Sequence, residues 1–168
     1  MKPAAFYERP TSRYEARYVP LYEAAAALIP PGARVVELGC GNGRFARYVT
    51  GPYIGLDFAP GQVAEAIRYN GGGDFRVADL MADDIPDADA YVALEVLEHL
   101  DDDLGLLRRL PRGATVVLSV PSFDSAAHVR HFPVPGSAAA RYSRVLELDH
   151  ASTIPLPRAY FHLLRGRT

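Results

Sequence analysis

The spacing of hydrophobic and polar positions changes several times along the chain. From Tyr14 to Ile29, apolar residues recur at intervals of three and four, which predicts a helix ended by Pro30 and Pro31. Short apolar runs follow, bounded by glycine, proline or acidic residues, and they predict buried strands. The predicted strands cover residues 33–38, 53–57, 74–77, 90–94, 115–120, 141–148 and 160–164.

The segments between the first five strands are helical in character. Helices are predicted over 44–50 and 60–69, and a third begins near Asp101, where three consecutive aspartates suit a helix N-terminus. Strands that alternate with helices favour a parallel sheet covered on both faces. The last two strands have no helix between them, which predicts an antiparallel edge. We therefore expect an α/β fold.

Length, composition and charge narrow the class of protein. The chain has 168 residues, 49% hydrophobic and 23% charged, which fits one ordinary globular domain over 1–168 with residues 1–30 as an N-terminal lid and helix segment. A net charge of -2 provides no global basic field for nucleic acid or an anionic membrane. The single cysteine, Cys40, excludes an intrachain disulfide and a multi-cysteine zinc site. With neither a signal peptide nor a run of about 20 apolar residues, we expect a cytoplasmic protein without a membrane span.

A glycine loop gives the strongest chemical signal. The first predicted strand opens into Gly39, Gly41 and Gly43, which lets the backbone turn tightly and lets a ligand approach the main chain. Asp57 ends the next strand, where an acid accepts two ribose hydroxyls. A dinucleotide site would have its third glycine where Arg44 stands, and an acid before the loop suits a cationic ligand better than a pyrophosphate. The pattern indicates an adenosine-type cofactor with a positive charge.

These residues resemble a known family. The run from Glu37 to Gly43 resembles motif I of the class I S-adenosylmethionine (SAM) methyltransferases, and Asp57 resembles their ribose-binding acid. Phe58 and the pair Asp79-Leu80 resemble the residues beside the adenine, and 93–100 resembles the segment at the methionine end. The resemblance spans 14–120. It implies that SAM contacts Tyr14, Glu37, Gly39, Cys40, Gly41, Gly43, Asp57, Phe58, Asp79, Leu80, Leu94 and Glu95.

The same resemblance implies a fold and a reaction. The fold is a Rossmann-like three-layer sandwich whose seven-stranded sheet has the order 3-2-1-4-5-7-6, with strand seven antiparallel. SAM lies across the carboxyl ends of strands one, two and four, and S-adenosylhomocysteine (SAH) is the product. Cys40 is expected to pack beneath the cofactor.

A second group of residues follows the fourth strand. If the segment is helical, Glu95, Glu98 and His99 share one face, and two carboxylates so close favour a proton or a divalent cation between them. The pattern resembles ubiquinone-biosynthesis O-methyltransferases and Hen-type small-RNA 2′-O-methyltransferases; in the latter it binds magnesium with a later histidine. His128 is chosen over His131 for that position. The metal candidates are Glu95, Glu98, His99 and His128, and the catalytic candidates are His99, His128 and Glu98.

Two alternatives stay open for these side chains. Without a metal, His99 or His128 acts as a general base. In a second alternative, Glu98 and His99 form a solvated helix start. In the N-terminal helix, Tyr14 and Arg17 are candidates for a lid over the cofactor, whereas Tyr18 and Tyr22 are expected to pack the helix onto the sheet.

The favoured function is methyl transfer to an oxygen of a small-molecule acceptor, possible with or without Mg2+ or another divalent cation. One alternative is an RNA 2′-O-methyltransferase, for which basic residues provide a candidate surface. Another is a non-catalytic SAM-binding module, or a site completed by a partner chain or a second copy, because little sequence separates strand five from the edge strands. The basic residues are Arg108, Arg109, Arg112, Arg165 and Arg167.

Overall fold

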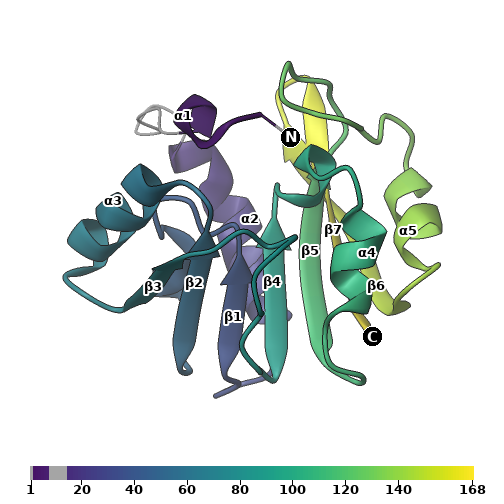
Figure 1. Cartoon of the computed structure of the whole chain (residues 1–168). Coiled ribbons are helices and arrows are strands. Elements are labelled where there is room, and N and C mark those ends of the chain that lie inside the picture. The colour runs from purple at the N-terminus through teal and green to yellow at the C-terminus, as the bar shows by residue number, and fades with distance from the viewer. Residues whose placement is uncertain (1, 8–14) are drawn as a thin grey trace.

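Seven strands form one sheet in this computed structural model, which describes residues 2–7 and 15–168 (Figure 1). The order is β3-β2-β1-β4-β5-β7-β6, and β1 to β5 run parallel while β7 is antiparallel to both of its neighbours. The expected Rossmann-like order is therefore confirmed. The strands are β1 (Val35–Leu38), β2 (Tyr53–Asp57), β3 (Asp74–Val77), β4 (Ala90–Leu94), β5 (Thr115–Pro121), β6 (Glu147–Leu156) and β7 (Ala159–Arg167).

Helices lie on both sides of this sheet, with α2 behind it and α4 and α5 in front in the view of Figure 1. Two single turns of 3-10 helix, η1 and η2, follow β1 and β4. The helical elements are α1 (Ala4–Tyr7), α2 (Glu15–Ala27), η1 (Phe45–Tyr48), α3 (Pro60–Asn70), η2 (Leu97–His99), α4 (Asp103–Arg108) and α5 (Ser137–Tyr142).

The core divides between the two faces of the sheet because neighbouring strand residues point in opposite directions. On β1, Val35 packs in the cluster that holds Leu21 of α2, whereas Val36 packs in the cluster that holds the leucines of α4. On β5, Val117 joins the first cluster and Val116 the second. Because both faces of the central strands are covered, these strands are buried along their whole length.

The helix predicted over 44–50 is wrong, because the chain forms only η1 there. Pro52 lies just ahead of β2, and its carbonyl accepts a hydrogen bond from the backbone of Val35 at the start of β1. Gly51 passes so close to Ala33 that an added Cβ would stand 2.1 Å from its carbonyl oxygen. The return to β2 is therefore too short for a full helix.

The strand predicted over 141–148 is also wrong. Residues 137–142 form α5, whose alanines favour a helix, and β6 begins only at Glu147 and continues to Leu156. The polar residues of β6 obscured it in the sequence, because an edge strand needs only one half-buried face. The acidic start of α4 is confirmed as a cap, since the Asp102 side chain accepts a 2.9 Å hydrogen bond from the Gly105 amide.

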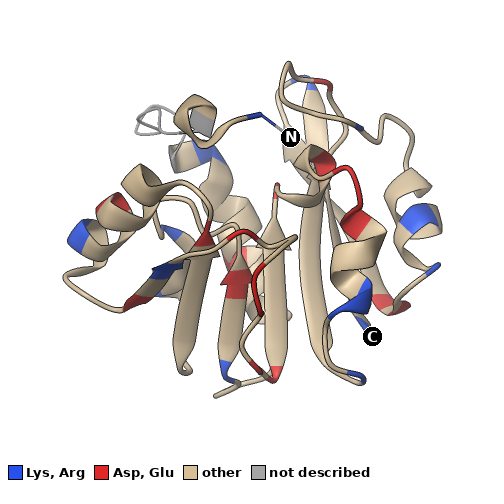
Figure 2. Cartoon of the chain, viewed as in Figure 1, with Lys and Arg blue, Asp and Glu red and all other residues tan. Residues whose placement is uncertain are grey.

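Residues 78–89 connect β3 to β4 without a helix. Arg109 fixes this connection by donating 2.5 Å hydrogen bonds to the carbonyls of Leu80 and Asp83. Figure 2 shows acidic residues spread along this connection, between the end of β3 and the start of β4.

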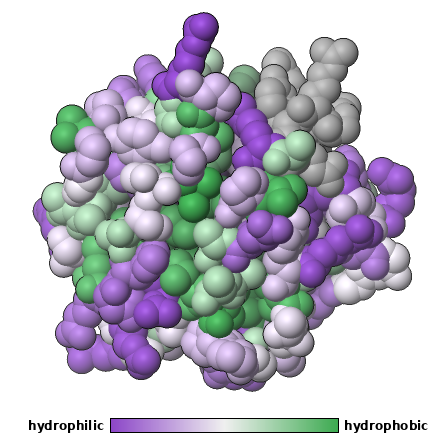
Figure 3. Space-filling view, turned by 180° about the vertical axis from the view of Figure 1, so that it is seen from behind, coloured by the Kyte–Doolittle hydropathy of each residue, from purple (hydrophilic) through white to green (hydrophobic). Residues whose placement is uncertain are grey.

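The back of the molecule carries a band of hydrophobic residues (Figure 3). A shallow groove of about 240 Å³ is lined by apolar side chains such as Ala26, Ile29 and Val49. It offers no titratable carboxylate, imidazole or thiol for chemistry. Within the described ranges, no helix combines the length and apolar character required to cross a bilayer.

Candidate active site

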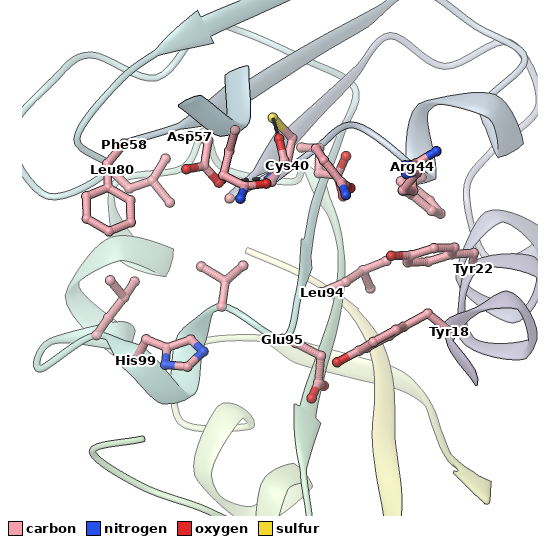
Figure 4. A pocket seen from close by; sticks show the side chains of 18 of the residues that line it. Tyr18, Tyr22, Cys40, Arg44, Asp57, Phe58, Leu80, Leu94, Glu95 and His99 are labelled. Carbon is pink, nitrogen blue, oxygen red and sulfur yellow. Dashed lines mark hydrogen bonds between the residues drawn. The ribbon is translucent and has the colours of Figure 1, made fainter. Parts of the chain in front are cut away.

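A cavity of about 450 Å³ opens at the carboxyl ends of β1, β2 and β4 (Figure 4). Ligands bind at this edge of doubly wound sheets, where the strand order reverses, and the volume is that of a small-molecule site. The glycine loop forms one wall, α2 a second, and the segment after β4 a third. The topology therefore selects the site that the glycine loop predicts.

The glycine loop needs glycine for two reasons. Gly39, Gly41 and Gly43 all have positive φ angles, of 75°, 50° and 72°. A Cβ on Gly39 would also lie 2.5 Å from a methyl carbon of Val96, in the cavity wall. On Gly43 it would lie 2.8 Å from the Cβ of Ala66 in α3. Gly39 thus allows the loop to approach the segment after β4, and Gly43 allows it to approach α3.

Asp57 ties the glycine loop to α3. Its Oδ2 accepts a 2.8 Å hydrogen bond from the Gly41 amide, and its Oδ1 accepts one of 2.9 Å from the Ala59 amide. Burial raises the pKa of this carboxyl, and the backbone hydrogen bonds oppose that shift. The neighbouring Phe58 also lines the cavity. The end of β2 therefore presents a positioned carboxylate beside an aromatic ring.

Glu37 is buried in the floor of the cavity, in β1. Its Oε2 accepts a short hydrogen bond from the hydroxyl of Tyr53, and burial raises its pKa to about 8. Cys40 lies close by and is buried, so that desolvation raises the pKa of its thiol far above the ordinary range. Cys40 is accordingly a packing residue in this wall rather than a nucleophile, as expected.

The β3–β4 connection forms the far side of the cavity through Asp79 and Leu80. Asp79 Oδ1 accepts a 2.9 Å hydrogen bond from the Met81 amide, which orients the carboxylate within the turn. Because Arg109 holds the Leu80 carbonyl, this wall is fixed although it has no helix.

Glu95 follows β4 directly and has a φ of 58°, a left-handed conformation that a non-glycine residue adopts rarely. Its amide donates to the Ser119 hydroxyl oxygen at 3.1 Å, and that hydroxyl donates to Oε1 of Glu95 at 2.8 Å. The prediction that 95–99 forms a helix is wrong, since only 97–99 make a 3-10 turn. The reversal at Glu95 places its carboxyl on Ser119, while Glu98 points elsewhere.

Glu98 is 1% exposed, which overturns the alternative of a solvated helix start. Both of its carboxylate oxygens are buried and have no hydrogen-bond partner among the described residues. Burial, and then the nearby Glu95, raise its pKa well above the ordinary value. An orphaned buried carboxyl is costly and requires a proton or a cation.

Two histidines stand beside this carboxyl. His99 Nδ1 lies 3.0 Å from the Ala127 carbonyl oxygen, and His128 Nδ1 lies 3.2 Å from that of Phe123. A carbonyl only accepts, so each ring is assigned its proton on Nδ1 and its lone pair on Nε2. Burial lowers the pKa of both rings, which keeps them neutral. One ligand atom from each of Glu98, His99 and His128 falls within 4.8 Å of the others, and Glu95 lies outside this group.

The N-terminal helix α2 supplies Arg17, Tyr18 and Tyr22 to the cavity wall (Figure 4). The Tyr18 ring also stacks on Phe161 of β7, with centroids 5.4 Å apart, so it packs the helix on the sheet as predicted. Tyr14, the predicted lid residue, lies outside the described residues.

Most of the predicted cofactor residues share this cavity. Of the other predicted site residues, Gly43 packs against α3, and the metal and catalytic candidates Glu98 and His128 lie next to His99 outside the cavity lining. Sequence reasoning missed several lining residues: Asn42 lies within the glycine motif and Arg44 directly follows it, so both could have been predicted, whereas Gln62 gave no signal. The predicted residues that line it are Glu37, Gly39, Cys40, Gly41, Asp57, Phe58, Asp79, Leu80, Leu94, Glu95 and His99.

The arginines considered for an RNA surface are not in this wall. Arg112 precedes β5 and Arg167 ends the antiparallel β7, so both lie at the opposite edge of the sheet from the cavity. Arg109 is engaged with the β3–β4 connection, and Arg165 donates to Asp149 at 2.8 Å.

Known proteins share both the sequence pattern and the fold. Residues 36–113 match the family model of the methyltransferase domain. A trans-aconitate 2-methyltransferase of Methylobacterium nodulans is 42% identical over 86 residues, covering 48% of this chain and 33% of that protein. A ubiquinone biosynthesis O-methyltransferase of Xanthomonas campestris is 32% identical over 117 residues, covering 61% and 49%. The chain thus spans between a third and about half of the length of these curated relatives.

The fold likeness extends over almost the whole chain. A methyltransferase from Haloferax volcanii, solved in complex with the Trm112 methyltransferase activator, superposes with a TM-score of 0.75 at 20% identity and covers 98% of this chain and 93% of its own. At that identity the likeness speaks for the fold alone, and the sequence matches add the glycine motif. The family model assigns residues 36–113 to the methyltransferase domain family, and the fold of the chain is that of the class I S-adenosylmethionine-dependent methyltransferases.

Proposed function

We propose that this chain binds SAM in the cavity and transfers its methyl group to an oxygen of a small-molecule acceptor, leaving SAH. The observation that carries the proposal is the glycine loop, which turns left-handed at three glycines and is tied to the Asp57 carboxylate. A nucleoside and its methionine chain would meet no Cβ at Gly39 or Gly41 of that loop. Membership in the methyltransferase family supports the reaction class.

The residues of the cavity wall form two groups, one for the adenosine end of SAM and one for its methionine end. Asp57 would accept hydrogen bonds from the ribose hydroxyls, with Phe58 and Leu80 beside the adenine and Asp79 near its amino group. Glu37 would face the ammonium and sulfonium charges from the floor. Leu94 and Glu95 would border the methionine end, and Tyr14 stays a prediction for the lid.

The transfer itself is a direct displacement. An electron pair of the acceptor oxygen forms the new bond to the methyl carbon, while the carbon–sulfur bond breaks and its pair stays on sulfur. The sulfonium charge supplies the driving force, and the walls supply the alignment. When no metal ion is bound, the hydroxyl proton requires another acceptor, for which we propose His99, because this neutral ring lines the cavity and carries its lone pair on Nε2.

A divalent cation fits the residues behind His99. The buried Glu98 carboxyl has no hydrogen-bond partner among the described residues, and one of its oxygens lies within 4.8 Å of a nitrogen of His99 and of a nitrogen of His128. Both imidazoles are oriented by backbone carbonyls, as metal-binding histidines usually are. Two nitrogen donors and one oxygen suit Zn2+ or Mn2+ better than Mg2+, which prefers oxygen. Such an ion would lower the pKa of an acceptor hydroxyl.

The cation is tested by calorimetry with Zn2+ on the folded chain. His128→Ala should abolish Zn2+ binding, because it removes one of the three donors. His131→Ala is the matched control, because its ring faces the exposed Asp124 at 3.7 Å and belongs to a different pair. Equal binding by wild type and His128→Ala would contradict the site.

The methyl transfer is tested by SAH formation from SAM over a panel of phenols, catechols and polycarboxylic acids. His99→Ala should lower turnover by about 100-fold, the usual contribution of a general base, while SAH affinity is retained. If wild type binds SAH tightly but turns over no acceptor, and His99→Ala changes nothing, the chain is a SAM-binding module instead.

We further propose that a partner chain or second copy completes the acceptor side. Support comes from the short stretch between β5 and β6 and from the Haloferax structural relative, which was solved with an activator. Turnover that rises with protein concentration, or on addition of a copurified partner, would bear this out. Full activity of an isolated monomer would exclude it.

A further inference from the structure

A tyrosine outside the cavity wall holds the carboxyl in its floor. Tyr53 is the first residue of β2 and pairs in register with Val35, two residues before Glu37 on the neighbouring strand. Its hydroxyl donates to Oε2 of Glu37. Glu37 lines the cavity, and Tyr53 is absent from that lining. The hydroxyl therefore bonds to the carboxyl from outside the cavity lining.

The surroundings of this pair are acidic or neutral. Asp57 of β2 adds negative charge near Glu37, and the buried Cys40 thiol of the glycine loop lies beside both. From α2, Tyr22 faces the Tyr53 hydroxyl, and on β4 the residue paired with Glu37 is the apolar Val92. Burial is the largest influence on the carboxyl, raising its pKa to about 8, and the Tyr53 hydrogen bond opposes it. The empty site therefore favours a protonated Glu37 at neutral pH.

We propose that Tyr53 is a positioning residue of the cofactor site, which holds the Glu37 carboxyl toward the cavity and couples the binding of a cationic sulfonium ligand to the release of one proton. This inference rests on the proposed function. The proton leaves the Glu37 carboxyl for solvent, the carboxylate faces the incoming positive charge, and the Tyr53 hydroxyl stays as its hydrogen-bond donor. Without that donor, the buried carboxylate would face the cation with a lone pair unsatisfied.

The direction of the pH dependence follows from this exchange. Below the pKa of the empty site, ligand binding must remove a proton, so SAM affinity should rise as pH increases from 7 to 8. Above that pKa, the carboxyl is already ionised, and affinity should level off. SAH lacks the sulfonium charge, so its binding should release a smaller fraction of a proton.

The test is calorimetric titration of the folded chain with SAM and with SAH, at pH 7 in phosphate and in Tris, whose ionisation enthalpies differ. For wild type, the apparent binding enthalpy of SAM should change with the buffer by an amount that corresponds to proton release. Tyr53→Phe should weaken SAM binding by roughly tenfold or more, the usual effect of removing a hydrogen bond to a charge, and should weaken SAH binding less.

The matched control is Tyr91→Phe, because Tyr91 is a buried tyrosine whose hydroxyl bonds to the Pro86 carbonyl and the Ala88 amide, away from the cavity. It should leave the SAM to SAH affinity ratio unchanged. Glu37→Gln provides a second variant if Tyr53→Phe does not fold, and it should lose the buffer dependence of the enthalpy.

Two results would overturn the inference: enthalpies of SAM binding that are identical in both buffers, or equal SAM to SAH ratios in wild type, Tyr53→Phe and Tyr91→Phe. A wild-type chain that binds neither ligand would instead overturn the proposed function on which the inference rests.

Discussion

The two halves of the cavity are built in different ways. The cofactor half comes from one continuous stretch, β1 through α3, in which Asp57 bonds to the glycine loop only 16 residues before it. The acceptor half joins the turn around η2 to a segment about 30 residues later. Three contacts make that joint: the Val129 amide donates to the Glu98 carbonyl at 2.8 Å, His99 meets the Ala127 carbonyl, and Arg130 reaches the turn.

Arg130 is the centre of this long-range joint. Its guanidinium donates to the carbonyls of Leu97 at 2.7 Å and Leu100 at 2.5 Å, and it lies 3.4 Å from the buried Asp103 carboxylate. Arg141 meets the same carboxylate from α5 at 2.6 Å. The two halves of the cavity therefore differ in what holds them. A local motif fixes the cofactor end, whereas the acceptor end depends on buried contacts between segments distant in the sequence.

The largest effect is expected at the glycine loop. Gly39→Ala should abolish measurable SAH binding, because its Cβ would collide with Val96 and the φ of 75° adds strain. Gly113→Ala has the same sign of φ but open space around the Cβ, so it should cost only about 1–2 kcal/mol of stability and leave SAH binding intact. Calorimetry and chemical denaturation measure both variants. Normal binding by Gly39→Ala would contradict the geometry of this wall.

The next effect concerns stability against pH. The native pKa of Glu37 lies above its unfolded value, so between these two values the native state binds more protons and the free energy of unfolding falls as pH rises. For one proton, the slope can reach about 1.4 kcal/mol per pH unit at most. Glu37→Gln should flatten that slope in urea denaturation from pH 5 to 8. A slope unchanged by the substitution would show that other groups cause it.

In the acceptor half, a substitution of Arg130 and one of Arg141 should have different effects, the first on activity and the second on stability. Arg130→Met should lower kcat/KM for methyl transfer by roughly tenfold or more, since a displaced turn misaligns reacting groups, while SAH affinity changes little. Arg141→Met removes the closer partner of Asp103, so it should lower stability by about 2–3 kcal/mol and spare activity. If activity merely followed stability across the two variants, Arg130 would have no positioning role.

The smallest effect is expected at the cap of α4, which joins neither half of the cavity. Asp102→Ala removes the side-chain acceptor of the Gly105 amide and should cost about 1 kcal/mol. Thermal denaturation should register the loss, and SAH affinity should stay at the wild-type value.

The same contrast explains what the sequence could predict. The bounds of β2, β3 and β4 follow from short apolar runs between breakers, and the order of the sheet follows from the family resemblance. The proposed cofactor residues could be predicted because the glycine loop and Asp57, which holds it, are close together in the sequence. The sequence did not predict α5 and β6 correctly, because a short alanine-rich helix and a polar edge strand show weak periodicity.

The acceptor half was only partly readable. The family resemblance grouped Glu98 and His99 with His128, and the structure brings these three together, but helical spacing also placed Glu95 on their face. The left-handed turn at Glu95, held by Ser119 from β5, could not be foreseen, because it depends on a contact 24 residues away. The orphaned carboxyl of Glu98 is likewise a property of burial that spacing does not reveal.

The most direct test of the account is a calorimetric titration of the folded wild-type chain with SAH, set beside Asp57→Ala. The account predicts binding at one site per chain, and its loss in Asp57→Ala, because that carboxylate both orders the glycine loop and faces the ribose. A wild-type chain that is folded and binds no SAH would contradict the central claim.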